Sequence, residues 1–131
     1  MLDVLACNDN PLTTLDVRNN TALHFLYVNN CSLTTLDVSN NTKLVYLYCE
    51  DNLLTTLDVS NNDILTRVSL ERNELTASAL NDLFRTLNGN PFIKNTYIPP
   101  GSMFIVLILG NPGTSDCDVS IAKEKGWTVY R

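Results

Sequence analysis

The sequence predicts an α/β solenoid, in which short coils of chain stack on one another and a mixed segment of helices and strands closes one end. The first observation is a repeat: the hexapeptide LTTLDV occurs at residues 12–17, 33–38 and 54–59, a constant interval of 21 residues, and a weaker copy begins at Leu75. The second is that apolar and polar residues alternate in the Leu-x-Cys and Leu-Asp-Val pieces, as they do in short strands. So short a unit cannot bury its apolar stripe alone, and neighbouring units must cover it.

One position of the repeat carries an inward polar side chain. Asn10, Asn52 and Asn73 occupy it, and Cys31 stands in register with them. A side-chain amide has both donors and an acceptor, so at a coil corner it can satisfy backbone groups that the turn leaves unpaired. We therefore expect a ladder of side chains at this corner. The pattern L-x-x-L-x-[CLV]-x-x-[NC]-x-L over residues 2–75 resembles the leucine-rich repeat, which implies a right-handed solenoid with a parallel sheet on its concave face.

We expect residues 1–75 to form the repeats, the first of them truncated, and residues 76–131 to form a C-terminal cap continuous with the solenoid. The stretch TASALNDLFRTLNG predicts an amphipathic helix on the convex side, with Thr76 as its N-cap and the Asn-Gly pair ending it. Residues 90–102 contain three prolines, which predict a loop.

The rest of the cap predicts a βαβ unit. Residues 104–109 form an apolar run of strand length, a short helix capped by Ser115 or Asp116 follows, and residues 127–130 form a last strand. The two strands are expected to be parallel. Placing Asn111 on the asparagine column aligns the first of them with the strands of the repeats. The expected ladder is Asn10, Cys31, Asn52, Asn73 and Asn111.

The tail GNPGTSDCDVSIAKEKGWTV, taken together with the LTTLDVSNNTKL repeats, is similar to a group of short leucine-rich repeat proteins encoded by gut commensal bacteria. The resemblance implies that the tail is a C-terminal cap and that the protein is secreted or displayed on the bacterial cell surface. The sequence has no signal peptide and no apolar run long enough to insert into a membrane. The first repeat has no capping element before it, so we expect either a fragment of a longer chain or self-association through this uncapped edge.

Composition argues against several classes of function. The net charge is −5 without any run of Lys or Arg, which disfavours nucleic acids as partners. The four cysteines form no C-x-x-C pair, and Cys7 and Cys49 lie two coils apart, beyond the reach of a disulfide, so buried free thiols are expected. The single histidine, His24, has no partner for acid–base catalysis and is expected to be an ordinary surface residue. We therefore expect no enzyme and no cofactor.

Outward side chains of the stacked strands should form columns on the concave face. Phe25 and Tyr46 share one column, Tyr27 and Tyr48 the next, and an acidic rim lies beside them. An aromatic centre with a polar rim is typical of interfaces, which favours a protein partner. The expected binding residues are Phe25, Tyr27, Tyr46, Tyr48, Glu50, Arg67 and Glu71. Three alternatives remain open: cross-strand packing without a ligand, a glycan-binding module, and a structural segment of a longer bacterial adhesin.

Asp16, Asp37 and Asp58 form a further column, in which like charges one coil apart would repel. Oxygen ligands suit Ca²⁺, but one carboxylate per coil falls short of the usual six to eight ligands, so these residues are only weak metal candidates. The alternative is that each carboxylate accepts hydrogen bonds from nearby threonine hydroxyls or backbone N–H groups, or is solvated.

Overall fold

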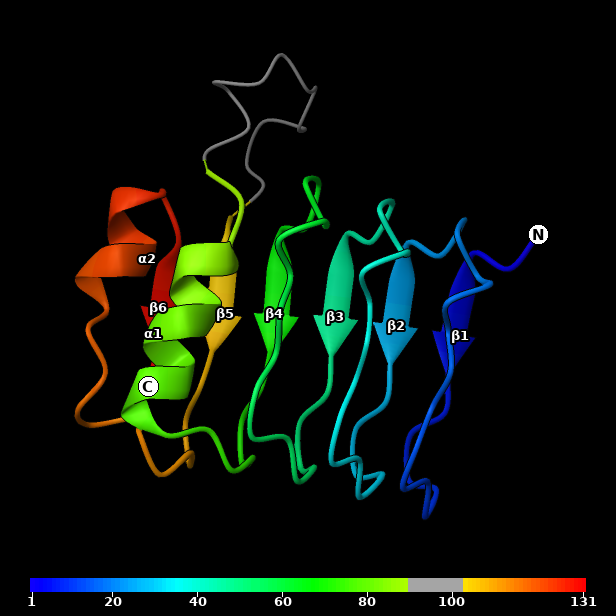
Figure 1. The fold of residues 1–131 in the computed structure, drawn as a ribbon, viewed down its shortest axis with the longest axis horizontal. Coiled ribbons are helices and arrows are strands. Elements are labelled where there is room, and N and C mark those ends of the chain that lie inside the picture. The colour runs from blue at the N-terminus through cyan, green and yellow to red at the C-terminus, as the bar shows by residue number, and fades with distance from the viewer. Residues whose placement is uncertain (90–102) are drawn as a thin grey trace.

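The structure, a computed structural model, describes residues 1–89 and 103–131 and forms a stack of coils along one sheet (Figure 1). All adjacent strands pair in parallel and follow one another in chain order. The strands are β1 (Val4–Ala6), β2 (Phe25–Tyr27), β3 (Tyr46–Tyr48), β4 (Arg67–Ser69), β5 (Ile105–Leu107) and β6 (Thr128–Tyr130). No helix interrupts residues 1–76, so turns and extended chain form the convex side of the repeats. The predicted solenoid is confirmed.

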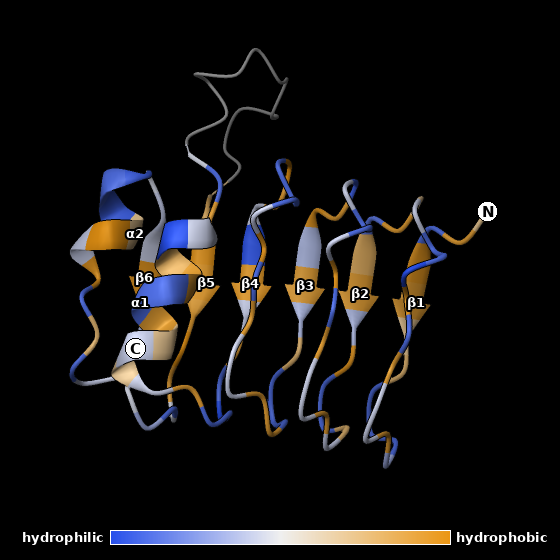
Figure 2. Ribbon diagram, viewed as in Figure 1, coloured by the Kyte–Doolittle hydropathy of each residue, from blue (hydrophilic) through white to orange (hydrophobic). Residues whose placement is uncertain are grey.

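The core is a set of apolar columns that run through the stack. Leu26, Leu47, Val68 and Val106 are paired in register on consecutive strands, and each is fully buried. The leucines and valines of the LTTLDV segments close the core from the other side. Figure 2 shows this alternation as apolar stretches separated by hydrophilic turns. Each fully buried aliphatic side chain stabilises the fold by about 1.5–3 kcal/mol, which explains why the stack needs no helix behind each strand.

After each repeat strand the chain turns at a residue with left-handed backbone conformation. Asp9, Asn30, Asp51 and Arg72 have φ of 59°, 53°, 52° and 52°, and Gly110 continues the series at 79°. Asn, Asp and Gly are the residues that adopt this conformation most readily. The turn brings the next residue, at the ladder position, into the interior.

The cap begins with α1 (Ala77–Thr86), which lies over the convex side beside the last repeat (Figure 1). Thr76 caps it as predicted, since its Oγ1 accepts a hydrogen bond of 3.3 Å from the N–H of Ala79. The apolar face of the helix is buried, and Thr86 Oγ1 accepts from the backbone N–H of Val59 at 3.3 Å. At the other end, Lys125 Nζ donates to the carbonyls of Arg85 and Leu87, where a cation favours a helix C-terminus.

The prediction that Ser115 or Asp116 caps the second helix is wrong. This helix, α2 (Ser120–Glu124), begins later, and it is Asp118 that accepts from the N–H of Ser120 at 3.0 Å. Residues 113–117 instead form hydrogen-bonded turns that lie against the start of α1. A Cβ at Gly113 would lie 2.1 Å from the backbone N of Ala77, so only glycine fits this approach.

The predicted alignment of the cap with the repeats is confirmed. Val68 is paired with Val106 across β4 and β5, and Val106 in turn with Val129 on β6. The sheet therefore runs without a break from the repeats into the cap. The loop predicted for residues 90–102 lies outside the described residues.

Candidate functional site

Four aromatic side chains come together on the concave face. The ring centroids of Phe25 and Tyr46 are 5.2 Å apart at an angle of 67°, and those of Tyr27 and Tyr48 are 5.3 Å apart at 24°. Tyr46 and Tyr48 also meet edge to face at 6.3 Å. All four side chains are half-buried in the absence of any partner. We call this group of Phe25, Tyr27, Tyr46 and Tyr48 the aromatic block.

Arg67 borders the aromatic block on β4. Its guanidinium carbon lies 5.9 Å from the centre of the Tyr46 ring, and its Nη1 donates to the hydroxyl of Tyr48 at 3.2 Å. The hydrogen bond to Tyr48 raises the pKa of Arg67. The cation is thus held against two rings of the block, an arrangement stabilised by about 0.5–1 kcal/mol when exposed.

The predicted acidic residues Glu50 and Glu71 lie beside the block, each two residues beyond the last residue of its strand. The hydroxyl of Ser69 is 2.7 Å from Oε1 of Glu50 and 3.3 Å from Oε2 of Glu71. Arg72 forms a bidentate salt bridge with Asp51, with N–O distances of 2.6 and 2.8 Å. Its Nη2 also lies 3.7 Å from Oε2 of Glu50. The Arg72 guanidinium lowers the pKa of Asp51.

Next to this acidic group the concave face is hollowed, a feature that the sequence analysis did not predict. The hollow has a volume of about 270 Å³. We call it the β4 hollow; it is lined by Tyr48, Glu50, Arg67, Ser69, Ile105, Leu107 and Tyr130. Four of these residues were missed: Ser69, Ile105, Leu107 and Tyr130. The placement of Asn111 on the ladder carried the signal for Ile105 and Leu107, because it makes both face outward beside β4.

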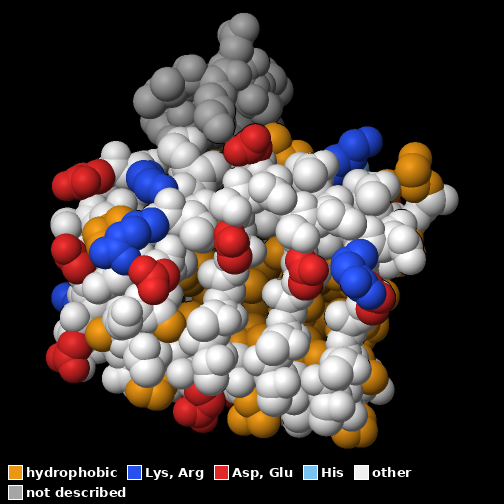
Figure 3. Space-filling model, in the orientation of Figure 1, with side chains coloured by type: hydrophobic (Ala, Val, Ile, Leu, Met, Phe, Trp, Pro, Cys, Tyr) orange, Lys and Arg blue, Asp and Glu red, His pale blue; other side chains and the backbone are white. Residues whose placement is uncertain are grey.

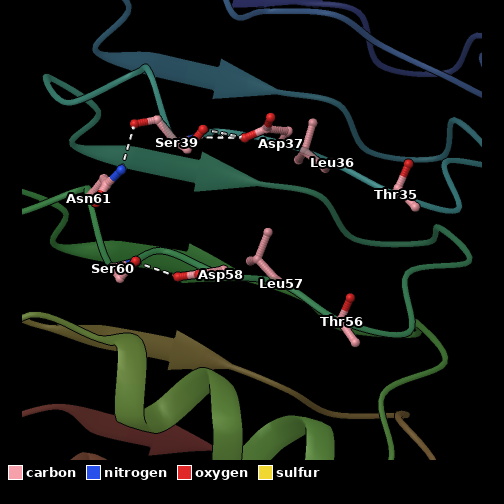
Figure 4. A pocket seen from close by; sticks show the side chains of 9 residues that line it. All are labelled: Thr35, Leu36, Asp37, Ser39, Thr56, Leu57, Asp58, Ser60 and Asn61. Carbon is pink, nitrogen blue, oxygen red and sulfur yellow. Dashed lines mark hydrogen bonds between the residues drawn. The ribbon is translucent and has the colours of Figure 1, made fainter.

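Furrows also run between the coils on the convex face, where Figure 3 shows apolar side chains at their floors and carboxylates alongside. One furrow holds about 330 Å³, with Leu36 and Leu57 among its lining residues (Figure 4). The predicted aspartate column lies along these furrows. A second furrow, lined partly by Asp16 and Asp37, repeats the arrangement one coil earlier. The furrows therefore follow from the repeat, because no helix fills the space between adjacent LTTLDV segments.

Each aspartate of this column is bonded within its own coil. Asp37 accepts a hydrogen bond from the backbone N–H of Ser39 at 3.0 Å, and Asp58 accepts one from the backbone N–H of Ser60 at 2.8 Å. Dashed lines in Figure 4 join each of these pairs. Asp16 accepts from Arg18, whose side-chain and backbone hydrogen bonds lower the pKa of Asp16 to about 2. Among residues 1–89 and 103–131, no group of three or more His, Cys, Asp or Glu side chains is placed to hold a metal ion.

Four of the five predicted ladder residues, Cys31, Asn52, Asn73 and Asn111, occupy one buried corner of the stack. The fifth, Asn10, is exposed and donates only to the carbonyls of Cys7 and Asn8 in its own coil, because the structure has no coil before it for Asn10 to bond to. Asn52 donates to the carbonyls of Val28, Cys49 and Glu50 and accepts from the N–H groups of Cys31 and Leu33. Asn73 and Asn111 repeat parts of this pattern in the following coils. Cys31 reproduces only the donor side, since its thiol donates to the carbonyls of Cys7 and Asn29. The four buried ladder residues therefore hold adjacent coils together.

A second asparagine ladder was not predicted. Asn41 Nδ2 donates to the carbonyls of Val17 and Asn20 at 3.0 Å each, and Asn62 repeats the pattern one coil later at 3.1 and 2.9 Å. Asn88 ends this ladder by donating to the carbonyl of Leu65 at 2.9 Å. The signal for this ladder was the Asn-Asn pair that recurs at residues 19–20, 40–41 and 61–62.

The prediction that His24 has no partner is wrong: the residue directly precedes β2, and its Nδ1 lies 2.5 Å from a carboxylate oxygen of Asp3. All four cysteines are free thiols, as predicted, and burial raises the pKa of Cys49 and Cys117. No helix of the described residues is both long and apolar enough to cross a bilayer.

Comparison with known proteins indicates the class of fold to which this chain is similar. No family model matches the chain, and none of the curated proteins matches it either. Among solved structures, it is similar to the functional domain of InlJ from Listeria monocytogenes, which is described as including a cysteine ladder. The sequences are 28% identical, and the structures match with a TM-score of 0.65. The match covers 94% of this chain but only 24% of the InlJ chain.

The parallel sheet, the ladder corner and this likeness define the fold as a leucine-rich repeat solenoid. InlJ is one protein that the chain is similar to, at a level of identity that supports the fold and the repeat class.

Proposed function

We propose that this chain is a non-enzymatic binding module that recognises a protein partner with its concave face. The observation that carries the proposal is the aromatic block, four half-buried rings gathered on one face of the sheet beside Glu50, Arg67 and Glu71. Tyrosine and arginine are enriched among residues that dominate binding energies, and a polar rim around such a centre excludes water. Aromatic pairs already stabilise the sheet by about 0.5–1.5 kcal/mol each, yet their outer surfaces stay open to a partner.

The proposal includes a place on the bacterial surface, either displayed or secreted. It is supported by the similarity to InlJ, a bacterial leucine-rich repeat protein. Because the chain spans 24% of that structure, the second candidate is a structural segment within a longer adhesin, whose binding residues lie elsewhere. A glycan ligand on the same tyrosines is the remaining alternative.

The test is binding of the labelled chain to arrays of proteins and of glycans. We expect signals on the protein array that the double variant Tyr46→Ser, Tyr48→Ser loses while its thermal unfolding stays cooperative. Leu53→Ser is the matched control, because Leu53 is 47% exposed and follows the ladder corner, away from the block. Equal binding by the double variant would overturn the proposal, and signals on the glycan array alone would favour a sugar ligand.

A further inference from the structure

The β4 hollow arises from one small residue in a row of large ones. Tyr48, Ser69, Leu107 and Tyr130 are paired in register across β3 to β6, so that Ser69 leaves a gap between larger neighbours. Ser69 is only 1% exposed and forms the base of the gap. A parallel register fixes the spacing of these side chains at about 4.8 Å per strand. The gap is therefore a permanent feature of the sheet.

The size and lining of the hollow fit one large apolar side chain. Ile105 and Leu107 line it with aliphatic carbon, and Tyr48 and Tyr130 flank it. Its volume of about 270 Å³ corresponds to roughly nine water molecules at about 30 Å³ each. A concave site lined mainly by apolar and aromatic carbon with a few polar groups at its rim can take up an apolar side chain of a partner.

One rim of the hollow carries negative charge that the protein compensates poorly. Glu50 and Glu71 both approach the hydroxyl of Ser69, which can donate its single hydrogen to only one of them at a time. The nearest cation, Arg72, is engaged by Asp51 at 2.6 Å and reaches Glu50 only at 3.7 Å. Like charges placed so close repel one another, and a cation from outside would relieve the repulsion.

The opposite rim carries the cation Arg67, which is held by the aromatic block. It donates to Tyr48 and lies over Tyr46, so its guanidinium is engaged by two rings of the block. The net charge of −5 adds a general attraction for basic partners. The charges of this region therefore favour a ligand with its positive group on the glutamate side.

We propose that the β4 hollow is the anchor site for an extended segment of a partner protein, which inserts one aromatic or branched aliphatic side chain. A Lys or Arg next to that side chain pairs with Glu50 and Glu71, while the rest of the segment crosses the aromatic block. This inference rests on the proposed function and specifies its partner. It places the centre of the contact at the junction of the repeats and the cap, across β3 to β6.

The test is selection from a displayed library of random peptides on the full chain, followed by affinity measurements on synthetic copies of the enriched peptides. Peptides with Lys or Arg adjacent to Phe, Trp, Tyr, Leu or Ile are expected. Ser69→Leu fills the hollow and should raise Kd at least about tenfold, the effect of losing one anchor. Tyr130→Ser, at a residue 48% exposed, removes one wall without touching the core and should also weaken binding.

The charge part of the proposal is tested by the double variant Glu50→Gln, Glu71→Gln, which should weaken binding at low salt and reduce its salt dependence. Enrichment of acidic peptides, or of none, would overturn the inference, as would unchanged affinity in both Ser69→Leu and Tyr130→Ser. If binding needs Tyr46 and Tyr48 but ignores Ser69 and Tyr130, the anchor site fails while the proposed function stands. If binding ignores all four residues, both fail.

Discussion

Replacing Asn52 by alanine should destabilise the solenoid by about 3–5 kcal/mol. The side chain is 4% exposed and makes five hydrogen bonds to backbone groups of two adjacent coils, at 2.8 to 3.3 Å. Each such bond contributes about 1 kcal/mol net, and a buried group left without a partner costs about 1–3 kcal/mol. The expected loss of 3–5 kcal/mol is smaller than the sum of these contributions. The reason is that Glu50 is half-buried, so its carbonyl can form a hydrogen bond to water once the Asn52 side chain is removed.

The structure supplies a matched control at the same ladder position. Cys31 makes only two hydrogen bonds through its thiol, at 3.1 and 3.3 Å, and thiols are weak donors. Cys31→Ala should therefore cost about 1–2 kcal/mol, mainly from lost packing. Asn52→Cys, which copies the neighbouring coil, should fall between the two alanine variants, because it restores donors but no acceptor for the N–H of Leu33.

The assay is urea unfolding followed by circular dichroism, with free energies extrapolated to zero denaturant and slopes compared between variants. Domains of this size are stable by about 5–15 kcal/mol, so the Asn52→Ala chain should still fold at low temperature. A loss below about 1 kcal/mol for Asn52→Ala, or an equal loss for Cys31→Ala, would refute the view that the amide ladder joins the coils.

Three further outcomes are expected. Gly113→Ala should lower Tm by about 10 °C, because the added Cβ would lie 2.1 Å from the backbone N of Ala77 and overpacking costs about 1–3 kcal/mol. Gly89→Ala is the matched control: a Cβ there would have no atom within 4 Å, so Tm should stay nearly unchanged. The pKa of Asp16 is lower in the folded chain, so the pairing of Asp16 with Arg18 stabilises the protein above about pH 4, and this stabilisation is lost as the pH falls towards 2. The difference in Tm between wild type and Asp16→Asn should therefore vanish between about pH 4 and pH 2. A difference that stays constant over this range would contradict the prediction. Thiol titration should label Cys7 first in the native protein, since it alone is half-buried, and all four thiols in denaturant; equal native rates would contradict the burial pattern.

Much of the fold was predictable because one pattern recurs at a constant interval. Identical LTTLDV segments allow only one stacking register, and that register determines which columns face the core and which face outward. The same argument placed Asn111 beside Asn73 across a long insertion. Thr76 was recognisable as a cap because N-caps depend on local chemistry, which needs no tertiary contact.

By itself, then, the sequence determined the solenoid, the ladder positions, the first helix of the cap and the neighbourhood of the aromatic rings. The tertiary structure alone decided where the cap contacts the repeats. The cap turn at Gly113 lies against the start of α1, and α2 begins at Ser120 with Val119 at its N-cap rather than Ser115 or Asp116. The β4 hollow likewise needs Ser69 between side chains from β3 and β5. The contacts of Gly113 with Ala77 and of Ser69 with Leu107 join segments some 36 to 38 residues apart, outside the repeat, where no periodicity fixes which side chains meet.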